Sequence, residues 1–258
     1  MTLALTHSVP ADINACELTY IERRPIDVAL AEQQHLNYRK TLSELGVEVV
    51  NLSINKDFPD AVFVEDAAVV VDEMAIMTLP GAKSRRGELA AWETELAKYR
   101  KITHLQPPAT LDGGDVLRIG KRLFVGRSAR TNEEGIRGLG QVLHPLGYHV
   151  VPVEIHDVLH LKTTCTALDN ETVLVNPIWL DTLPLVEAGF QIVEVAHGEN
   201  WAANVLPVNG RVLLGAGNPY TSEKLVRLGY AVEPVDIREF EKAEGSLSCL
   251  SIIFEQQP

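Results

Sequence analysis

A short pattern recurs along most of this chain and constrains its fold more than any other feature. A valine-rich segment, usually released by a glycine, closes each unit: LGVEVVNL from Leu45, RKITHL from Arg100, LGYHVVPV from Leu146, AGFQIVEV from Ala188 and LGYAVEPV from Leu228. A period of roughly 40 to 50 residues indicates one supersecondary unit that buries its apolar faces only against its neighbours. The sequence therefore predicts units packed in a ring or a row.

Each complete unit is expected to run strand, strand, helix, strand. Apolar side chains spaced by three and four predict helices within 26–45, 89–99, 131–146, 180–187 and 221–228. Thr131 with Glu134 resembles a capping box for the third helix, and Thr221 or Ser222 is expected to cap the fifth. Hairpin turns are predicted at Asp72-Glu73, Gly120-Lys121, Asp169-Asn170 and Asn209-Gly210.

The two ends of the chain carry incomplete units. LALTHSVP, from Leu3, is a strand with no hairpin before it, and CLSIIF, from Cys249, runs into the polar tail EQQP. Pairing these two segments would close a ring. No Pro/Gly/Ser-rich linker divides the chain, so we expect one α/β domain over residues 1–258.

Charge and cysteine content narrow the class of protein. The net charge is −12 and no Lys/Arg cluster is present, which argues against nucleic acid and is compatible with a cationic substrate. The N-terminus lacks a signal-peptide pattern, and no apolar run approaches the ~18 residues of a membrane span. The three cysteines fit neither a disulfide framework nor a CxxC metal site. We therefore expect a soluble, cytoplasmic protein with free thiols and no membrane partner.

The segments that open the units carry the residues of chemical interest. They are FVEDAAVVV with Glu65 and Asp66, TLDGGDVLRI with Asp112, HLKTTCTAL with His160, ENWAANVLPV with Asn204 and SLSCLSIIF with Cys249. Each alone has an ordinary structural explanation, since free cysteine is commonly buried and acidic residues are common in turns. Equivalent ends of units in a ring would, however, bring a nucleophile, a base and cation binders into one cleft. Gly113-Gly114 predicts a close backbone approach there.

Several motifs in order along the chain resemble the dimethylarginine dimethylaminohydrolases, a family of the guanidine-modifying superfamily. They are FPDAVFVED from Phe58, PGAKSRRGE from Pro80, TLDGGDVL from Thr110, VGRSARTNEEG from Val125, HLKTTC from His160, NWAANVL from Asn200 and GSLSCLS from Gly245. The resemblance covers nearly the whole chain. It implies a five-bladed, pseudo-symmetric α/β propeller, which agrees with the repeat and with a ring closed by the N-terminal strand.

The resemblance also implies a role for each site residue. Cys249 would be the nucleophile, His160 the general acid and base, and Asp112 the carboxylate that orients His160. The substrate-binding residues would be Glu65 and Asp66 at the guanidinium, Asp60 and the Ala243 carbonyl at the α-amino group, Arg85 and Arg130 at the carboxylate, Leu18 in the lid loop, and Ser248. The family implies no metal and no organic cofactor.

The implied activity is hydrolysis of an Nω-methylated arginine to citrulline and an alkylamine, through a covalent cysteine intermediate. The binding partner would be this methylated arginine, and a homodimer is a possibility that the sequence leaves open. Arginine deiminases place an aspartate two residues after the catalytic histidine, where this chain has Lys162, so the pocket is expected to accept methyl groups. Arginine deiminase, another substituted-guanidine hydrolase, a glutamine-type amidohydrolase and a noncatalytic arginine-binding protein remain the alternatives, and the preferred methylarginine is left open.

Overall fold

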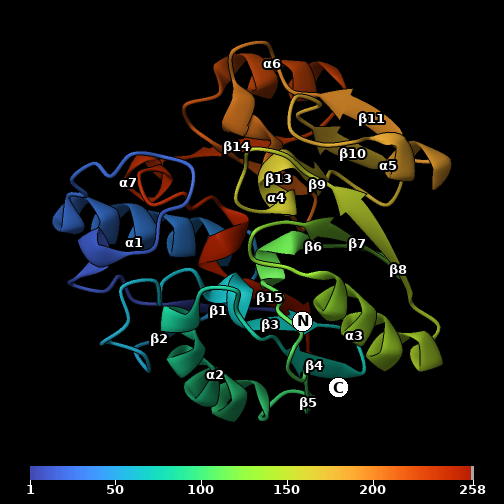
Figure 1. The fold of residues 1–258 in the computed structure, drawn as a ribbon. Helices are drawn as coiled ribbons and strands as arrows, with labels where there is room; N and C mark the ends of the chain where they lie inside the picture. Colours follow the sequence, from blue (N-terminus) through green and yellow to red (C-terminus); the bar gives the residue numbers. More distant parts are fainter. Residues whose placement is uncertain (257–258) are drawn as a thin grey trace.

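Five small sheets arranged around a common centre form the framework of the molecule (Figure 1). The structure, a computed structural model, describes residues 1–256. Each sheet has three strands, in the orders β15-β1-β2, β3-β4-β5, β6-β7-β8, β11-β10-β9 and β12-β13-β14. The middle strand pairs antiparallel with its hairpin partner and parallel with the strand that returns after a helix. The predicted order of strand, strand, helix, strand is confirmed.

The strands and helices have the following bounds. The strands are β1 Thr2–His7, β2 Glu48–Leu52, β3 Ala68–Val70, β4 Met74–Met77, β5 Lys101–His104, β6 Val116–Ile119, β7 Arg122–Arg127, β8 His149–Glu154, β9 Cys165–Ala167, β10 Thr172–Val175, β11 Gln191–Glu194, β12 Leu206–Val208, β13 Arg211–Gly215, β14 Val232–Val235 and β15 Ile252–Glu255. The helices are α1 Val28–Glu44, α2 Leu89–Leu96, α3 Glu133–Leu143, α4 Leu161–Thr164, α5 Leu183–Glu187, α6 Pro219–Arg227 and α7 Arg238–Glu241.

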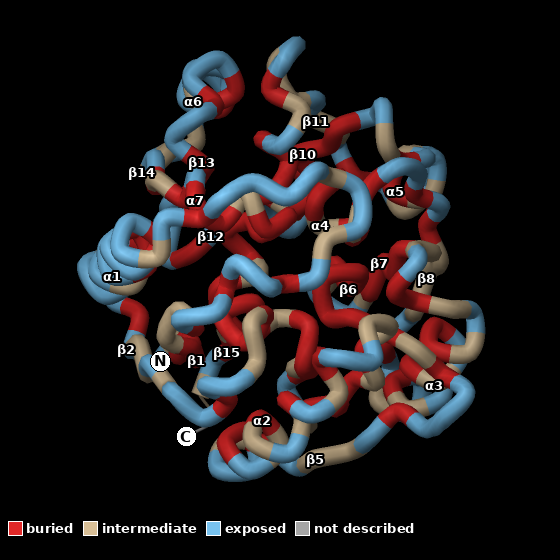
Figure 2. The backbone as a smooth tube through the Cα atoms, turned by 60° about the vertical axis from the view of Figure 1, so that its left-hand side comes forward, coloured by how far each residue is buried: buried red, intermediate tan, exposed pale blue. Residues whose placement is uncertain are grey.

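The two ends of the chain close the ring, as the sequence predicts. Strand β1 lies between β15, with which it pairs antiparallel, and β2, with which it pairs parallel. The Gln256 amide donates to the Met1 carbonyl at 2.9 Å. Figures 1 and 2 both draw the two termini near each other. The fold is the five-bladed α/β propeller that the sequence predicts.

Apolar clusters between neighbouring blades hold the ring together. Side chains of β1 and β15 pack with those of β3, β4 and α2 in one cluster, which includes the fully buried Trp92. Buried segments lie inside and exposed ones on the outer helices and loops (Figure 2). Burial of apolar surface contributes about 25 cal/mol per Å², so each blade is stabilised by the next. Among the described residues no helix is both long and apolar enough to span a bilayer.

Two helix caps differ from the prediction. The N-cap of α3 is Asn132, whose side-chain oxygen accepts from the Gly135 amide at 2.8 Å, and Thr131 lies outside the helix. Helix α6 begins at Pro219, and the Glu199 carboxylate rather than Thr221 or Ser222 accepts its first amides. In both cases the prediction of threonine as the cap was wrong, because the threonine hydroxyl bonds to another segment. Contacts with other segments therefore determine which residues cap these two helices.

A single helical turn precedes the inner strand of every blade, which is β3, β6, β9, β12 or β15. These turns are Val64–Ala67, Gly113–Asp115, α4, Asn200–Ala203 and Ser248–Leu250. The sequence pattern predicts the polar residues directly at the strand starts, and it does not reveal these turns. Asp, Asn, Ser and Thr favour such local turns because their side chains bond nearby backbone groups. The turns carry or adjoin the residues predicted to form the site.

Candidate active site

A small cavity lies where the helical turns of several blades meet. Seven of the predicted site residues line it: Asp60, Asp66, Arg85, Arg130, His160, Ala243 and Cys249. Asp112 is fully buried beneath His160. Glu65 and Ser248 line a separate central cavity between the inner strands, and Leu18 packs against the apolar core beside α1. The fold thus brings together residues that lie up to about 190 positions apart in the sequence.

Cys249 is the one partly exposed cysteine, whereas Cys16 and Cys165 are buried. It lies in the turn Ser248–Leu250, and its amide donates to the Ser246 carbonyl at 3.2 Å. Burial, together with the charges of Glu65 and Asp66, raises the pKa of the Cys249 thiol to about 12. The thiol is therefore protonated in the free protein at neutral pH, and a cation bound beside it would favour the thiolate.

His160 is held between two carboxylates. Its Nε2–H donates to Asp112 Oδ2 at 3.1 Å, and the same nitrogen lies 3.9 Å from Asp66 Oδ1. Burial alone would lower the pKa of His160, but the charges of Asp66, Asp112 and Asp115 outweigh it and raise the pKa to about 9. At neutral pH this imidazole is a cation that can give up a proton.

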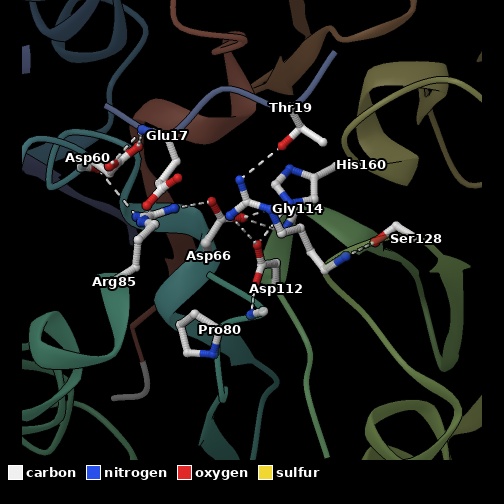
Figure 3. A network of polar contacts seen from close by, with 12 residues as sticks. Glu17, Thr19, Asp60, Asp66, Pro80, Arg85, Asp112, Gly114, Ser128 and His160 are labelled. Atoms are coloured by element: carbon white, nitrogen blue, oxygen red, sulfur yellow. Dashed lines mark hydrogen bonds and ion pairs between the residues drawn. The ribbon is translucent and has the colours of Figure 1, made fainter. Parts of the chain in front are cut away.

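Asp66 connects the imidazole to the rest of the site. Its Oδ1 accepts from the Gly114 amide at 2.9 Å and its Oδ2 lies 2.5 Å from Arg85 Nη1 (Figure 3). Burial would raise the pKa of Asp66, but His160 and Arg85 hold it at about 2. A Cβ at Gly114 would lie 2.6 Å from His160 Nδ1, and one at Gly113 would lie 2.0 Å from the Glu65 carbonyl oxygen. The predicted close approach at these glycines is confirmed.

Glu65 has both carboxylate oxygens engaged. One pairs with Lys162 Nζ, and the other accepts from the Ser248 hydroxyl at 2.8 Å. Asn204 Nδ2 in turn donates to Ser248 Oγ at 2.9 Å. Burial raises the pKa of Glu65, and Lys162 opposes that rise. Lys162 is therefore the counter-ion of Glu65.

The Arg85 guanidinium is hydrogen-bonded to several groups of the protein itself. Its guanidinium pairs with Glu88 and Asp66 and donates to the Phe63 carbonyl at 2.8 Å. Its side chain is 6% exposed. Asp60 is similarly occupied, because both of its carboxylate oxygens accept from the Glu17 amide at 3.2 Å. Burial raises the pKa of Asp60 to about 6 although Arg85 opposes the rise.

Arg130 has fewer partners than Arg85. Its Nη2 donates to the Thr19 hydroxyl at 3.2 Å and its Nη1 lies 3.8 Å from Asp112 Oδ2. An additional anion in the cavity could therefore be bound by this guanidinium.

An acidic residue that the sequence pattern does not single out binds the loop that contains Leu18 beside the cavity. Glu244 is buried and accepts from the amides of Thr19 at 2.6 Å and Tyr20 at 2.7 Å. Glu88, which binds Arg85, was also missed. Neither lies at a unit opening. Glu88 lies three residues after Arg85, a helical spacing that could have indicated the pair, whereas no spacing marks Glu244.

Asp66, Asp112 and His160 could together offer ligands to a metal ion, since their ligand atoms lie within 4.8 Å of one another. The guanidinium of Arg85 already bonds to Asp66, and that of Arg130 lies beside Asp112. These side chains supply the positive charge that a cation would otherwise bring to the two carboxylates.

Comparisons with known proteins agree with this arrangement. A family model described as arginine deiminase matches residues 90–187. The chain is 42% identical to an N(G),N(G)-dimethylarginine dimethylaminohydrolase of Streptomyces coelicolor, over 91% of this chain and 90% of that one. It is 37% identical to the enzyme of the same name from Pseudomonas aeruginosa, over 88% of this chain and 90% of that one.

A solved structure of the Pseudomonas aeruginosa protein, a Cys-to-Ser variant complexed with citrulline, superposes with a TM-score of 0.91 at 34% identity, covering 98% of each chain. A second structure with a TM-score of 0.91, also 34% identical and covering 98% of this chain and 99% of that one, is a dimethylarginine dimethylaminohydrolase adduct with S-methyl-L-thiocitrulline. Fold and site together define a guanidine-modifying α/β propeller. The chain belongs to the dimethylarginine dimethylaminohydrolase family, in the amidinotransferase superfamily.

Proposed function

We propose that this chain hydrolyses Nω-methylated arginine to citrulline and methylamine or dimethylamine. It is a hydrolase that acts on carbon–nitrogen bonds, as the names of its relatives indicate. The observation that carries the proposal is that one small cavity is lined by a thiol, an imidazole between two carboxylates, and a guanidinium with few partners. These groups match a substrate with a cationic guanidinium at one end and a carboxylate at the other.

In this proposal the two ends of the substrate contact different parts of the site. Asp66 binds the guanidinium, and Glu65, paired with Lys162, adds negative charge from the side of the central cavity. Arg130 binds the carboxylate, while Arg85 acts mainly by holding Asp66. The remaining assigned contacts are Asp60 and the Ala243 carbonyl at the α-amino group, Leu18 in the lid loop, and Ser248 through Glu65.

The first half of the reaction forms a covalent intermediate. The bound cation lowers the pKa of Cys249, the thiol releases its proton to water, and the thiolate attacks the guanidinium carbon. A carbon–sulfur bond forms and gives a tetrahedral adduct. The His160 imidazolium then donates its proton to the methylated nitrogen, the carbon–nitrogen bond breaks, and the amine leaves a thiouronium on Cys249. Asp112, which accepts from His160, keeps the imidazole in place.

The second half uses the neutral imidazole left by the first. His160 takes a proton from water, and the resulting hydroxide attacks the thiouronium carbon. The carbon–sulfur bond breaks, the hydroxyl proton of the adduct passes to the departing sulfur as the carbonyl forms, and citrulline is released with the Cys249 thiol and the His160 imidazolium restored. One acid/base group therefore serves both steps.

An assay of citrulline and amine release across arginine, monomethylarginine and both dimethylarginines tests the proposed function. We expect turnover of monomethylarginine and asymmetric dimethylarginine, with arginine much slower. Arginine deiminase is the second candidate, because that family model matches part of the chain. If ammonia release from arginine exceeds amine release from the methylarginines, arginine deiminase activity would replace the proposed function.

Three further properties belong to the proposal. Residues 1–258 act as one domain, which the interlocked blade clusters support. The protein works in the cytoplasm, which its free cysteines support. It forms a homodimer, for which the exposed apolar side chains of Ile178, Leu183 and Val186 are available. Sedimentation equilibrium of wild type and Leu183→Glu would test the dimer.

A further inference from the structure

Asp115 is a fully buried carboxylate that lies outside the cavity. It ends the turn Gly113–Asp115, and both of its oxygens are used. Oδ1 accepts from the Leu161 amide at 2.9 Å. Oδ2 accepts from the hydroxyls of Ser128 and Thr131, each at 2.6 Å. The residue therefore joins the blade of β6 and β7 to the start of α4 in the next blade.

On one side, Asp115 fixes the backbone beside His160. Leu161 is the first residue of α4, and its N-cap, His160, makes no capping bond with its own side chain. Asp115 supplies that bond from the neighbouring blade. The contact is tight, because a Cβ at Gly126 would lie 2.9 Å from both Asp115 Oδ1 and Leu161 Cβ. The position from which the imidazole projects thus depends on this carboxylate.

On the other side, Asp115 orders the loop that carries Arg130. Ser128 Oγ donates to Asp115 and accepts from the amides of Arg130 at 3.0 Å and Thr131 at 3.1 Å. Thr131 Oγ1 donates to Asp115 and accepts from the Asp112 amide at 3.2 Å. The Ser128 and Thr131 hydroxyls are held in one orientation, with their oxygens free to accept amides, because Asp115 Oδ2 accepts both of their protons.

We propose that Asp115 is a positioning residue that sets His160, Asp112 and Arg130 relative to one another, and so links acid/base chemistry to recognition of the substrate carboxylate. The inference rests on the proposed function of the site. Asp115 contacts neither the cavity nor the imidazole, so it acts through the backbone. Its charge also acts on His160 across the intervening turn, as one of the three carboxylates that raise the imidazole pKa.

Asp115→Asn tests the proposal because it keeps the shape of the side chain. An amide offers one accepting oxygen, so it can serve the Leu161 amide or the two hydroxyls, but not both. We expect kcat to fall and KM to rise together, with kcat/KM lower by about 10²-fold, the scale of a misplacement of about 1 Å. The imidazole titration of His160, followed by NMR, should move to lower pH because a nearby negative charge is lost.

Glu199→Gln is the matched control. Glu199 is also a buried carboxylate that accepts backbone amides at the start of a helix, here Tyr220 at 2.8 Å and Thr221 at 2.6 Å. The Glu199→Gln substitution should lower Tm, while kcat, KM and the His160 titration stay unchanged. Unchanged kinetics in Asp115→Asn, or the same kinetic losses in both variants, would overturn the inference. A wild-type protein inactive on methylarginines would instead refute the proposed function.

Ser128→Ala provides a second test if Asp115→Asn fails to fold. It removes the acceptor of the Arg130 amide and leaves the Leu161 contact intact. We expect KM for methylarginine to rise about tenfold with a much smaller change in kcat. KM for an N-methylated alkylguanidine without a carboxylate should not change. An equal rise for both substrates would contradict a role through Arg130.

Discussion

Arg85 and Glu88 form a bidentate ion pair inside the protein, with Nε 3.0 Å from Oε1 and Nη2 3.0 Å from Oε2. The two side chains are only 6% and 2% exposed. With Asp66 also bonded to this guanidinium, the charge of Arg85 is balanced before any ligand arrives. We therefore expect the two arginines that the family resemblance places at the substrate carboxylate to have different tasks, and the difference can be measured.

Arg85→Met and Arg130→Met should affect different properties. Removing Arg85 leaves Glu88 and Asp66 without their buried partner, and breaking such a pair costs about 3–5 kcal/mol of folding free energy. Removing Arg130 should raise KM for methylarginine at least about tenfold, with a smaller loss of stability than in Arg85→Met because its contacts with Thr19 and Asp112 are fewer and longer. Urea unfolding and steady-state kinetics of both variants test this, and equal stability losses would contradict the distinction.

Cys249→Ser should abolish turnover and leave the fold intact, because one atom changes at a partly exposed position. Loss of a nucleophile costs several orders of magnitude in kcat. Cys165→Ala, at a buried cysteine outside the cavity, is the control and should keep wild-type kcat. Citrulline release by Cys249→Ser within about tenfold of wild type would reject the nucleophile assignment.

The pH dependence of kcat/KM should follow the two shifted groups. Reaction needs the Cys249 thiolate, whose free-enzyme pKa is about 12, together with the His160 imidazolium, whose pKa is about 9. As pH rises the thiolate fraction grows while His160 keeps its proton, so kcat/KM should increase up to about pH 9 and then level off. In the complex the substrate cation favours the thiolate, so kcat should level off at lower pH. A kcat/KM maximum below neutral pH would contradict this order.

Lys162→Met should weaken the negative charge at the guanidinium. Burial raises the pKa of Glu65 and Lys162 opposes that rise, so the methionine variant should protonate Glu65 over a wider pH range. We expect lower kcat/KM at neutral pH for every guanidine substrate, with partial recovery at higher pH. Lys121→Met removes an exposed pair with Glu73 and should change nothing. An unaltered pH profile in Lys162→Met would show that this lysine does not control Glu65.

The repeat predicted the architecture well because it reflects local backbone preferences. Alternating apolar strands, helices spaced by three and four, and the turn at Asn209-Gly210 each depend on nearby residues. Pairing of β1 with β15 followed from two half-units that had no other partner. The helical turns before the inner strands were missed because their short polar sequences also fit strand openings.

The sequence by itself determined the type of blade, the number of blades and the residues that open each one. Only the tertiary structure decided which charges meet there: Lys162 with Glu65, and Glu244 with the loop after Leu18. Such pairs depend on side-chain reach and burial across blades, and no spacing along the chain encodes them. Because an unpaired charge is costly in a buried site, these contacts set which groups stay ionised and which are occupied by the protein before a substrate binds.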